Sequence, residues 1–215
     1  MNFEVINLGQ TVVKYKVPLD IYITINQIYE SKFNELLPAN HQLVGKIKNE
    51  HSLFYNGQEG PKLKKHSHLP LTVLKWFEQC YLNYLDCNHI KGHKIHLTSI
   101  WVNTMFEHEY NPVHVHQGDL YTGLSSVMIL KLPKSFGVEY SANDQPQNGK
   151  LQILGSANGQ FALIDYQPKI RERDFYIFPY DMRHTVYPFN GPDYRRTLAA
   201  NCDVDYNPIT NRGAT

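Results

Sequence analysis

The sequence predicts a mainly β protein whose core is a double-stranded β-helix, or jelly roll, supported by helices in its N-terminal part. After residue 93, short segments rich in Ile, Val, Thr, Tyr and Phe alternate with clusters of Gly, Asn, Asp and Pro, which is the rhythm of a barrel or sandwich. No helical segment separates these strands, and this argues against a parallel sheet. Before residue 93, two segments carry apolar residues at helical spacing instead. We therefore expect an antiparallel jelly roll capped by two helices.

Two amphipathic helices are predicted in the N-terminal part. The first covers residues 21–37 and ends at Pro38, which cannot continue a helix. The second begins near Pro70, because proline is favoured in the first turn of a helix. Its apolar stripe, which is typical of a face packed on a core, contains Val73, Trp76, Phe77, Cys80, Tyr81, Tyr84 and Leu85. The polar segment 49–70 between the helices is predicted to be an exposed loop.

The β part is predicted from eight segments with strand composition. They are residues 94–106, 123–132, 137–140, 150–155, 160–166, 173–179, 184–189 and 195–204. Asn148-Gly149 and Asn158-Gly159 mark tight turns, since this dipeptide favours the backbone of short hairpins. We expect one domain over residues 1–215, with a helical or capping part at 1–92 and the jelly-roll core at 93–205.

Charge and cysteine content exclude several classes of protein. Lys plus Arg number 21 and Asp plus Glu number 20, a formal net charge of +1, so a nucleic-acid-binding surface is not expected. The three cysteines lack CxxC spacing, which argues against a disulfide framework and a Cys-rich zinc site. The N-terminus has no signal-peptide pattern, and no apolar run approaches the roughly 20 residues of a membrane span. We expect a cytoplasmic protein without a membrane partner.

The 11 histidines of the chain raise the question of a metal site. In the segment NPVHVHQGD, residues 111–119, His114 and His116 stand two positions apart. Side chains two apart in a strand point to the same face, so both imidazoles can reach one point inside a barrel. The alternative is an HxH pair exposed on the surface.

Two later segments add candidates for the same barrel. His184 begins a strand directly after the turn Pro179 to Met182, a position from which it can point to the mouth of the barrel or simply pack in the rim. Arg195 and Thr197 share one face of the last strand, with Leu198 and Ala200 on the other. An inward arginine needs an anion, which is either a ligand carboxylate or an internal Asp or Glu.

The order and spacing of these pieces resemble those of the iron(II)- and 2-oxoglutarate-dependent oxygenases. In that superfamily a His-x-(Asp/Glu) pair ends an early strand, and a distal His is followed by Arg-x-Ser or Arg-x-Thr; here Arg195 follows His184 by 11 positions. The chain looks most similar to a branch common in marine bacteria and their phages, over roughly residues 95–203. The pieces that carry the resemblance are Trp101-Val102-Asn103, His114-Val115-His116, Thr122-Gly123, Phe178-Pro179 with His184, and Arg195-Arg196-Thr197 with Asn201.

The resemblance implies an iron(II) site formed by His114, His116 and His184, with one departure from the superfamily. The residue two positions after the first histidine is usually a carboxylate, and here it is His116. Non-haem iron is usually held by two histidines and one carboxylate, so three imidazoles leave the site one negative charge short. Two alternatives stay open: Asp119 would replace His116 if the strand ends early, and Asp181 is a more distant candidate.

The cofactors and the reaction also follow from the resemblance. 2-Oxoglutarate would chelate the iron while its far carboxylate meets Arg195, assisted by Thr197. Asn103 is a further candidate contact with the co-substrate, or else a buried amide that satisfies a strand end. The implied activity is that of a dioxygenase, or hydroxylase. It couples decarboxylation of 2-oxoglutarate to succinate with oxidation of a primary substrate by O2, and it needs no catalytic residue beyond the metal ligands.

The sequence does not identify the primary substrate. Prolyl hydroxylases are among the relatives by fold, so a peptidyl substrate is one candidate, and Tyr110, Tyr121, Tyr180 and Tyr187 are candidates to line the mouth. Two other classes of protein stay open. A cupin-like metalloprotein that does not use 2-oxoglutarate would need the histidines without an inward Arg195. A non-catalytic jelly-roll binding or structural protein of a phage would need neither.

Overall fold

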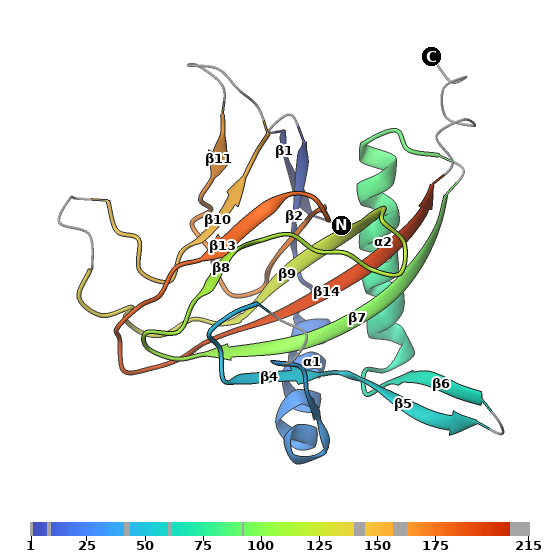
Figure 1. The fold of residues 1–215 in the computed structure, drawn as a ribbon, viewed down its shortest axis with the longest axis horizontal. Coiled ribbons are helices and arrows are strands. Elements are labelled where there is room, and N and C mark those ends of the chain that lie inside the picture. The colour runs from blue at the N-terminus through green and yellow to red at the C-terminus, as the bar shows by residue number, and fades with distance from the viewer. Residues whose placement is uncertain are drawn as a thin grey trace.

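The computed structural model of the chain describes residues 2–7, 10–40, 44–59, 62–91, 93–139, 145–156 and 163–206. Within these ranges the strands form two stacked sheets and a separate hairpin, and their pairings are antiparallel. In Figure 1 the smaller sheet lies in front of the larger one, and the two long helices lie behind it. The predicted antiparallel β core is confirmed, and the described residues after 93 include no helix between its strands.

The large sheet has eight strands among the described residues. Their order is β1 (Phe3–Asn7), β2 (Thr11–Lys16), β12 (Asp174–Pro179), β9 (Gly123–Lys131), β14 (Arg195–Tyr206), β7 (His93–Met105), β4 (Asn49–Ser52) and β3 (Leu37–Pro38). The small sheet has the order β11 (Asp165–Tyr166), β10 (Leu151–Leu154), β13 (Arg183–Val186) and β8 (Asn111–His114). Because sequence neighbours such as β13 and β14 lie in different sheets, the chain passes repeatedly between the two layers, as a jelly roll requires.

Both helices cover the face of the large sheet that points away from the small one. Helix α1 (Leu19–Lys32) is followed by a short 3-10 turn (Phe33–Glu35), and α2 (Leu71–Cys87) starts directly after Pro70. The apolar stripe predicted for α2 is buried or partly buried in the main core, and Cys80 is fully buried. The first helix ends earlier than predicted, because Leu37 and Pro38 pair with β4 as a short edge strand.

The two faces of β14 face different cores, as its alternation predicts. Leu198 and Ala200 lie in the core beneath the helices, while Arg195 and Thr197 line a hollow between the sheets. The same division holds for β9 and β12, which give Val127 and Phe178 to a second apolar core between the sheets. Buried residues of these strands therefore form one wall of the hollow between the two layers.

Some strand predictions differ from the structure. Residues 137–139 are not a strand, and of 163–166 only Asp165 and Tyr166 are. Asn148 and Gly149 form the expected turn, with Gly149 at a positive φ of 65°, whereas Asn158-Gly159 lies outside the described residues. Strands β1 and β2, which extend the large sheet beyond β12, were not predicted.

The segment 49–70 is not the loop that its polar composition predicts. Its first residues form β4, which pairs with β7, and β5 (Phe54–Glu59) and β6 (Lys62–Ser67) form a hairpin. Strand pairing satisfies the backbone regardless of side-chain polarity, so a polar segment beside a long strand can still be part of the sheet.

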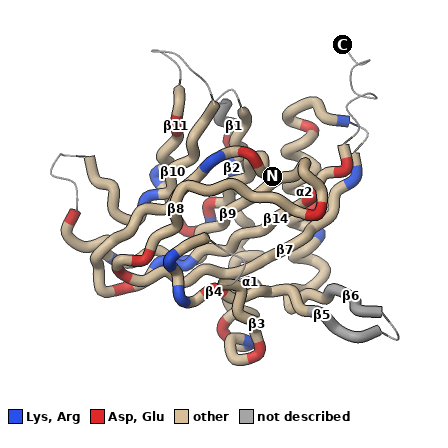
Figure 2. Tube along the Cα trace, viewed as in Figure 1, with Lys and Arg blue, Asp and Glu red and all other residues tan. Residues whose placement is uncertain are grey.

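Lysines and arginines alternate with acidic residues along the described trace (Figure 2). This mixture agrees with the nearly neutral composition of the chain. The described residues include no helix long and apolar enough to span a membrane.

Candidate metal centre

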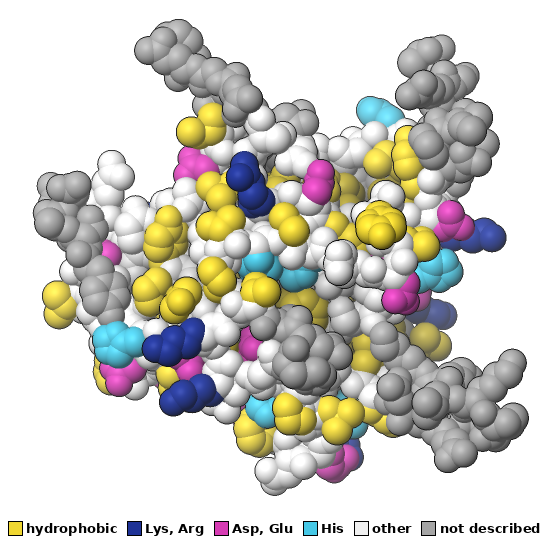
Figure 3. Space-filling view, in the orientation of Figure 1, with side chains coloured by type: hydrophobic (Ala, Val, Ile, Leu, Met, Phe, Trp, Pro, Cys, Tyr) yellow, Lys and Arg dark blue, Asp and Glu magenta, His cyan; other side chains and the backbone are white. Residues whose placement is uncertain are grey.

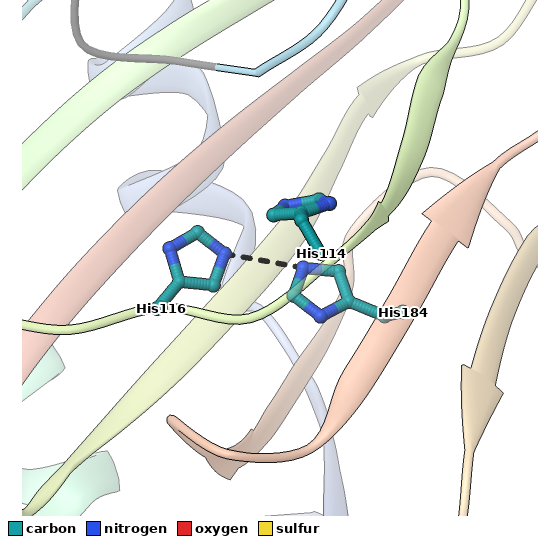
Figure 4. A group of neighbouring side chains, drawn as sticks. All are labelled: His114, His116 and His184. Carbon is teal, nitrogen blue, oxygen red and sulfur yellow. Dashed lines mark hydrogen bonds between the residues drawn. The ribbon is translucent and has the colours of Figure 1, made fainter.

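Three histidines from two strands and a loop converge between the sheets. His114 ends β8, His184 lies in the paired strand β13 directly opposite it, and His116 lies in the segment after β8. One ligand atom from each histidine lies within 4.8 Å of the others. The three rings face one another in Figure 4, and His116 Nε2 is 3.1 Å from His184 Nε2. In the space-filling view, histidine side chains lie near the middle of this face among hydrophobic ones (Figure 3).

Backbone carbonyls hold two of the rings by one nitrogen. His114 Nδ1 lies 2.8 Å from the Pro112 carbonyl oxygen, and His184 Nδ1 lies 3.1 Å from that of Met182. A carbonyl can only accept, so each Nδ1 donates a proton and each Nε2 keeps its lone pair. This is the tautomer in which an imidazole binds a metal through Nε2.

The electrostatic surroundings keep the histidines neutral. Burial, reinforced by His114, lowers the pKa of His184 to about 3. Burial, together with the two other rings, holds the pKa of His116 well below its usual value, and burial lowers that of His114. The cluster therefore presents uncharged imidazoles, as metal ligation requires.

The third ring, His116, has a side-chain partner instead of a carbonyl. Asn201 Nδ2 lies 3.4 Å from His116 Nδ1, while Asn201 Oδ1 is buried without a partner. Metal binding through His116 Nε2 requires a proton on Nδ1, and that proton needs an acceptor. Rotating the Asn201 amide by half a turn supplies one, because oxygen and nitrogen exchange places.

Neither alternative acidic ligand joins the cluster. Asp119 is exposed, and Asp181 is exposed and accepts a hydrogen bond from Gln10. Neither belongs to the group of converging ligand atoms. His116 is thus the third member, and Asp119 and Asp181 are not.

Arg195 enters the same hollow as a buried cation. Its side chain is 2% exposed, and its Nε and Nη2 atoms have no hydrogen-bond partner. Among the described residues no carboxylate forms a salt bridge with it, in contrast to the neighbouring Arg196, which pairs with Glu30 on the opposite face. The alternative partner for Arg195, an internal Asp or Glu, is therefore absent from the described part of the chain. Burial lowers the pKa of Arg195 to about 10, which leaves it charged at neutral pH.

Thr197 and Asn103 lie opposite each other on paired strands beside this arginine. The register of β14 and β7 pairs them, and both side chains line the hollow with the three histidines and Arg195. Asn103 Oδ1 is buried without a partner. The predicted site residues therefore all face one hollow of about 480 Å³, open mouth included.

The residues present fit a divalent metal with an anionic ligand beside it. Three neutral imidazoles with free Nε2 atoms are a metal-binding donor set. A buried guanidinium with unused donors is costly unless an anion meets it, and its planar fork matches a carboxylate. The donor chemistry of this hollow thus agrees with the metal and co-substrate expected from the resemblance.

A tight contact holds the segment that carries His116. Asp203, which is 2% exposed, accepts hydrogen bonds from the Leu120 amide and from the Tyr180 hydroxyl. A Cβ at Gly118 would lie only 1.7 Å from Asp203 Oδ1, so this close approach requires glycine. The His116 amide also donates to the Tyr180 carbonyl at 2.9 Å. Tyr180 is therefore a buried support, not the mouth residue that we expected, whereas Tyr110 and Tyr121 are exposed.

Sequence reasoning missed Glu50, which also lies near the histidines. It belongs to β4, opposite Asn103, and lines a second hollow with His114 and His116. No pattern in the sequence identifies a single glutamate in a polar segment. Only the pairing of β4 with β7 brings it to the site.

The chain is similar to known proteins in sequence profile and in fold. Residues 99–201 match the sequence profile of the family described as "Putative 2OG-Fe(II) oxygenase". No curated protein matches the chain.

Solved structures of other proteins share its fold, and three of them serve as examples. A prolyl-4-hydroxylase from Pseudomonas putida has a TM-score of 0.56 at 12% identity, over 89% of this chain and 91% of that one. A prolyl hydroxylase from Trichoplax adhaerens, in complex with a hypoxia inducible factor peptide fragment, has 0.52 at 13%, over 99% and 86%. HygX from Streptomyces hygroscopicus, with nickel, 2-oxoglutarate and hygromycin B bound, has 0.50 at 8%, over 90% and 83%. Likeness at such identities concerns the fold, and it confirms the predicted double-stranded β-helix.

Proposed function

We propose that this chain is a hydroxylase with its active site at the His114–His116–His184 cluster. Residues 99–201 match the 2OG-Fe(II) oxygenase family, whose members are oxidoreductases that use iron(II), 2-oxoglutarate and O2. The observation that carries the proposal is that these histidines share a hollow with a buried arginine that has no anionic partner among the described residues. A metal ion and a dicarboxylate are the ligands that such a pair of features fits.

The three histidines hold iron(II) in this proposal. Pro112 and Met182 fix the rings of His114 and His184 through their carbonyl oxygens, and Asn201 orients His116. When bound, iron(II) and 2-oxoglutarate supply oxygen activation, with decarboxylation of 2-oxoglutarate to succinate and oxidation of the primary substrate. No other side chain is needed as an acid or base.

Arg195 binds the far carboxylate of 2-oxoglutarate. Its Nε and Nη2 atoms are the unused donors, and two parallel N–H bonds to one carboxylate orient the co-substrate. Thr197 contributes its hydroxyl from the same strand face, and Asn103, on the paired strand, contributes its amide. Burial of this end of the hollow excludes water, so each of these bonds is stronger than it would be at the surface.

A peptidyl primary substrate is the first to test. Val113 and Val115, which flank His114, are 53% and 52% exposed, so the outer side of β8 and the segment after it offers apolar contacts to an extended chain. We also propose a cytoplasmic location in a bacterium or a phage-infected host, since Cys80, Cys87 and Cys202 are all free thiols.

Anaerobic titration with iron(II) and 2-oxoglutarate tests the site. The chelate of both gives a weak visible charge-transfer band, which we expect in the wild type. His184→Ala should lose metal binding, and Arg195→Ala should keep the metal but bind 2-oxoglutarate at least about tenfold more weakly, as expected when a charged hydrogen bond is lost. Arg196→Ala is the matched control, because Arg196 stands next in the strand and faces away from the hollow.

Two results would contradict the proposal. Absence of the band in the wild type would exclude 2-oxoglutarate, and metal binding without it would favour a cupin-like metalloprotein. A band that persists unchanged in both His184→Ala and Arg195→Ala would place the site elsewhere. An identified product that has gained one oxygen atom, found by mass spectrometry, would establish hydroxylation.

A further inference from the structure

A second hollow adjoins the one that contains Arg195. The two share Trp101, Asn111, His114 and His116, so they meet at the histidine cluster. The second hollow has a volume of about 340 Å³, its open side included, and its other walls are Val44, Glu50 and Val115. It therefore reaches the cluster from a different side than Arg195 does.

Glu50 is the charged group of this second hollow. Its side chain is 1% exposed, and its cross-strand neighbour is Asn103, so it faces the space between the sheets. Asn40 Nδ2 donates to its Oε2 atom at 3.3 Å. No lysine or arginine in the described ranges forms a salt bridge with it. Glu50 is thus a buried carboxyl that lacks a cation.

The nearby Glu109 shows what a structural carboxylate looks like here. Its Oε1 accepts from the Lys48 amide at 3.1 Å and its Oε2 from the Phe106 amide at 2.9 Å. Both oxygens of Glu109 thus accept from the backbone, whereas among the described residues the Glu50 carboxylate accepts a single hydrogen bond, from the Asn40 side-chain amide. The fold uses Glu109 and leaves Glu50 available.

A second polar atom points to a ligand in the same place. Asn111 Oδ1 is buried without a hydrogen-bond partner, and Asn111 lines the hollow with Glu50. A buried acceptor without a donor is unfavourable unless a bound group supplies one. A bound donor would satisfy Asn111 Oδ1, and Glu50 favours a donor that carries positive charge.

Glu50 is not placed to be a further metal ligand. Its oxygens do not belong to the group of ligand atoms that lie within 4.8 Å of one another. The walls on either side of it are apolar, and Val44 and Val115 are 59% and 52% exposed. A group that enters here would pass an apolar rim before it reaches the carboxyl.

We propose that Glu50 determines substrate specificity by binding a cationic group, an amine or guanidinium on an alkyl stem, of the primary substrate. The proposal rests on the proposed function, because it makes the second hollow the place where that substrate is held beside the metal. The two hollows then bind groups of opposite charge. Arg195 binds the dicarboxylate co-substrate, and Glu50 binds a cationic primary substrate. A lysyl or arginyl side chain of a peptide has this chemistry.

Binding of small probes tests the proposal on the full chain. The probes are n-butylammonium, n-butanol and n-pentanoate, which share one butyl stem and differ in charge. Their affinities are measured by ligand-observed NMR near pH 8, with manganese(II) and 2-oxoglutarate and again without either. We expect the wild type to bind butylammonium at least about tenfold more tightly than butanol, since a charge-assisted bond in a buried site exceeds a neutral one.

Two variants and one control locate the preference. Glu50→Gln should bind butylammonium and butanol equally, while Asp119→Asn, which removes an exposed acid from the segment after His116, should keep the preference. Val44→Lys introduces a competing ammonium at the rim and should weaken butylammonium binding even if Glu50→Gln fails to fold. Equal binding of the probes by the wild type, or a preference that survives in folded Glu50→Gln, would overturn the proposal.

The outcome is separable from that of the proposed function. A chain that binds butylammonium through Glu50 but gives no charge-transfer band keeps the cationic site and loses 2-oxoglutarate. A band without any preference for the amine keeps the oxygenase and removes Glu50 from substrate binding.

Discussion

Glu50→Gln should stabilise the protein at neutral and alkaline pH. Burial, with a smaller effect of Glu109, raises the pKa of Glu50 from its ordinary value of 4.5 to about 7. The unfolded chain therefore ionises this carboxyl at lower pH than the folded protein does. Glutamine has nearly the same shape and still accepts the hydrogen bond from Asn40, so the substitution removes the charge and little else.

The sign and size of the effect follow from proton linkage. Below about pH 4.5 the carboxyl is protonated in both states, and its contribution to stability is fully present. As pH rises through the folded pKa of about 7, the folded state must ionise a buried group, and at about 1.4 kcal/mol per pKa unit about 3 kcal/mol is lost. For a protein whose total stability is of order 5–15 kcal/mol, this is a large fraction.

Urea unfolding of the metal-free protein at about pH 5 and about pH 8 measures this difference. The free energy of unfolding of Glu50→Gln minus that of the wild type should increase by about 2–3 kcal/mol between the two pH values. Glu107→Gln, which neutralises an exposed acid, is the control and should show almost no change. Parallel pH profiles for the wild type and Glu50→Gln would refute the reasoning, because they would mean that Glu50 ionises normally in the folded protein.

Three further substitutions test how the site is held. Arg195→Met should raise the free energy of unfolding of the ligand-free protein by about 1 kcal/mol or more, since it removes a buried unpaired charge. It should also abolish the rise in Tm that bound 2-oxoglutarate gives the wild type. A Tm of ligand-free Arg195→Met below that of the ligand-free wild type would indicate that Arg195 has an anionic partner in the fold. Asn201→Ala should lower metal affinity about 10–100-fold, because His116 loses the partner for its Nδ1 proton; competition with a metal-binding dye measures this, and unchanged affinity would mean that His116 is oriented otherwise. Gly118→Ala should cost about 2 kcal/mol or more in thermal unfolding, because its Cβ meets the Asp203 carboxylate, and a neutral effect would show that the segment before Leu120 can shift freely.

Local pattern was enough to predict much of the fold. Helix α2 follows from a stripe of apolar residues and the proline that precedes it, and its Cys80 is buried as expected. The alternation of β14 correctly predicted that Arg195 and Thr197 share a face. These features depend on residues a few positions apart, which the sequence displays directly.

The convergence of histidines was predictable only in part. The spacing of His114 and His116 indicated one face, but His116 lies beyond the end of β8, and a hydrogen bond from its amide to Tyr180 holds it there. Whether His116 or Asp119 joins the cluster therefore depended on this long-range contact. Local spacing could not decide between them.

The sequence by itself determined the two helices, the antiparallel β core after residue 93, the near-neutral charge, and the set of side chains that could hold a metal and a dicarboxylate. Only the tertiary structure showed that the polar segment after residue 48 contains a strand of the large sheet, and that Glu50 consequently faces the histidines across the pairing of β4 with β7. Strand pairing joins residues more than fifty positions apart through backbone hydrogen bonds that are the same for every side chain. For this reason the candidate metal-binding histidines could be recognised in the sequence, whereas the charge of the hollow beside them could not.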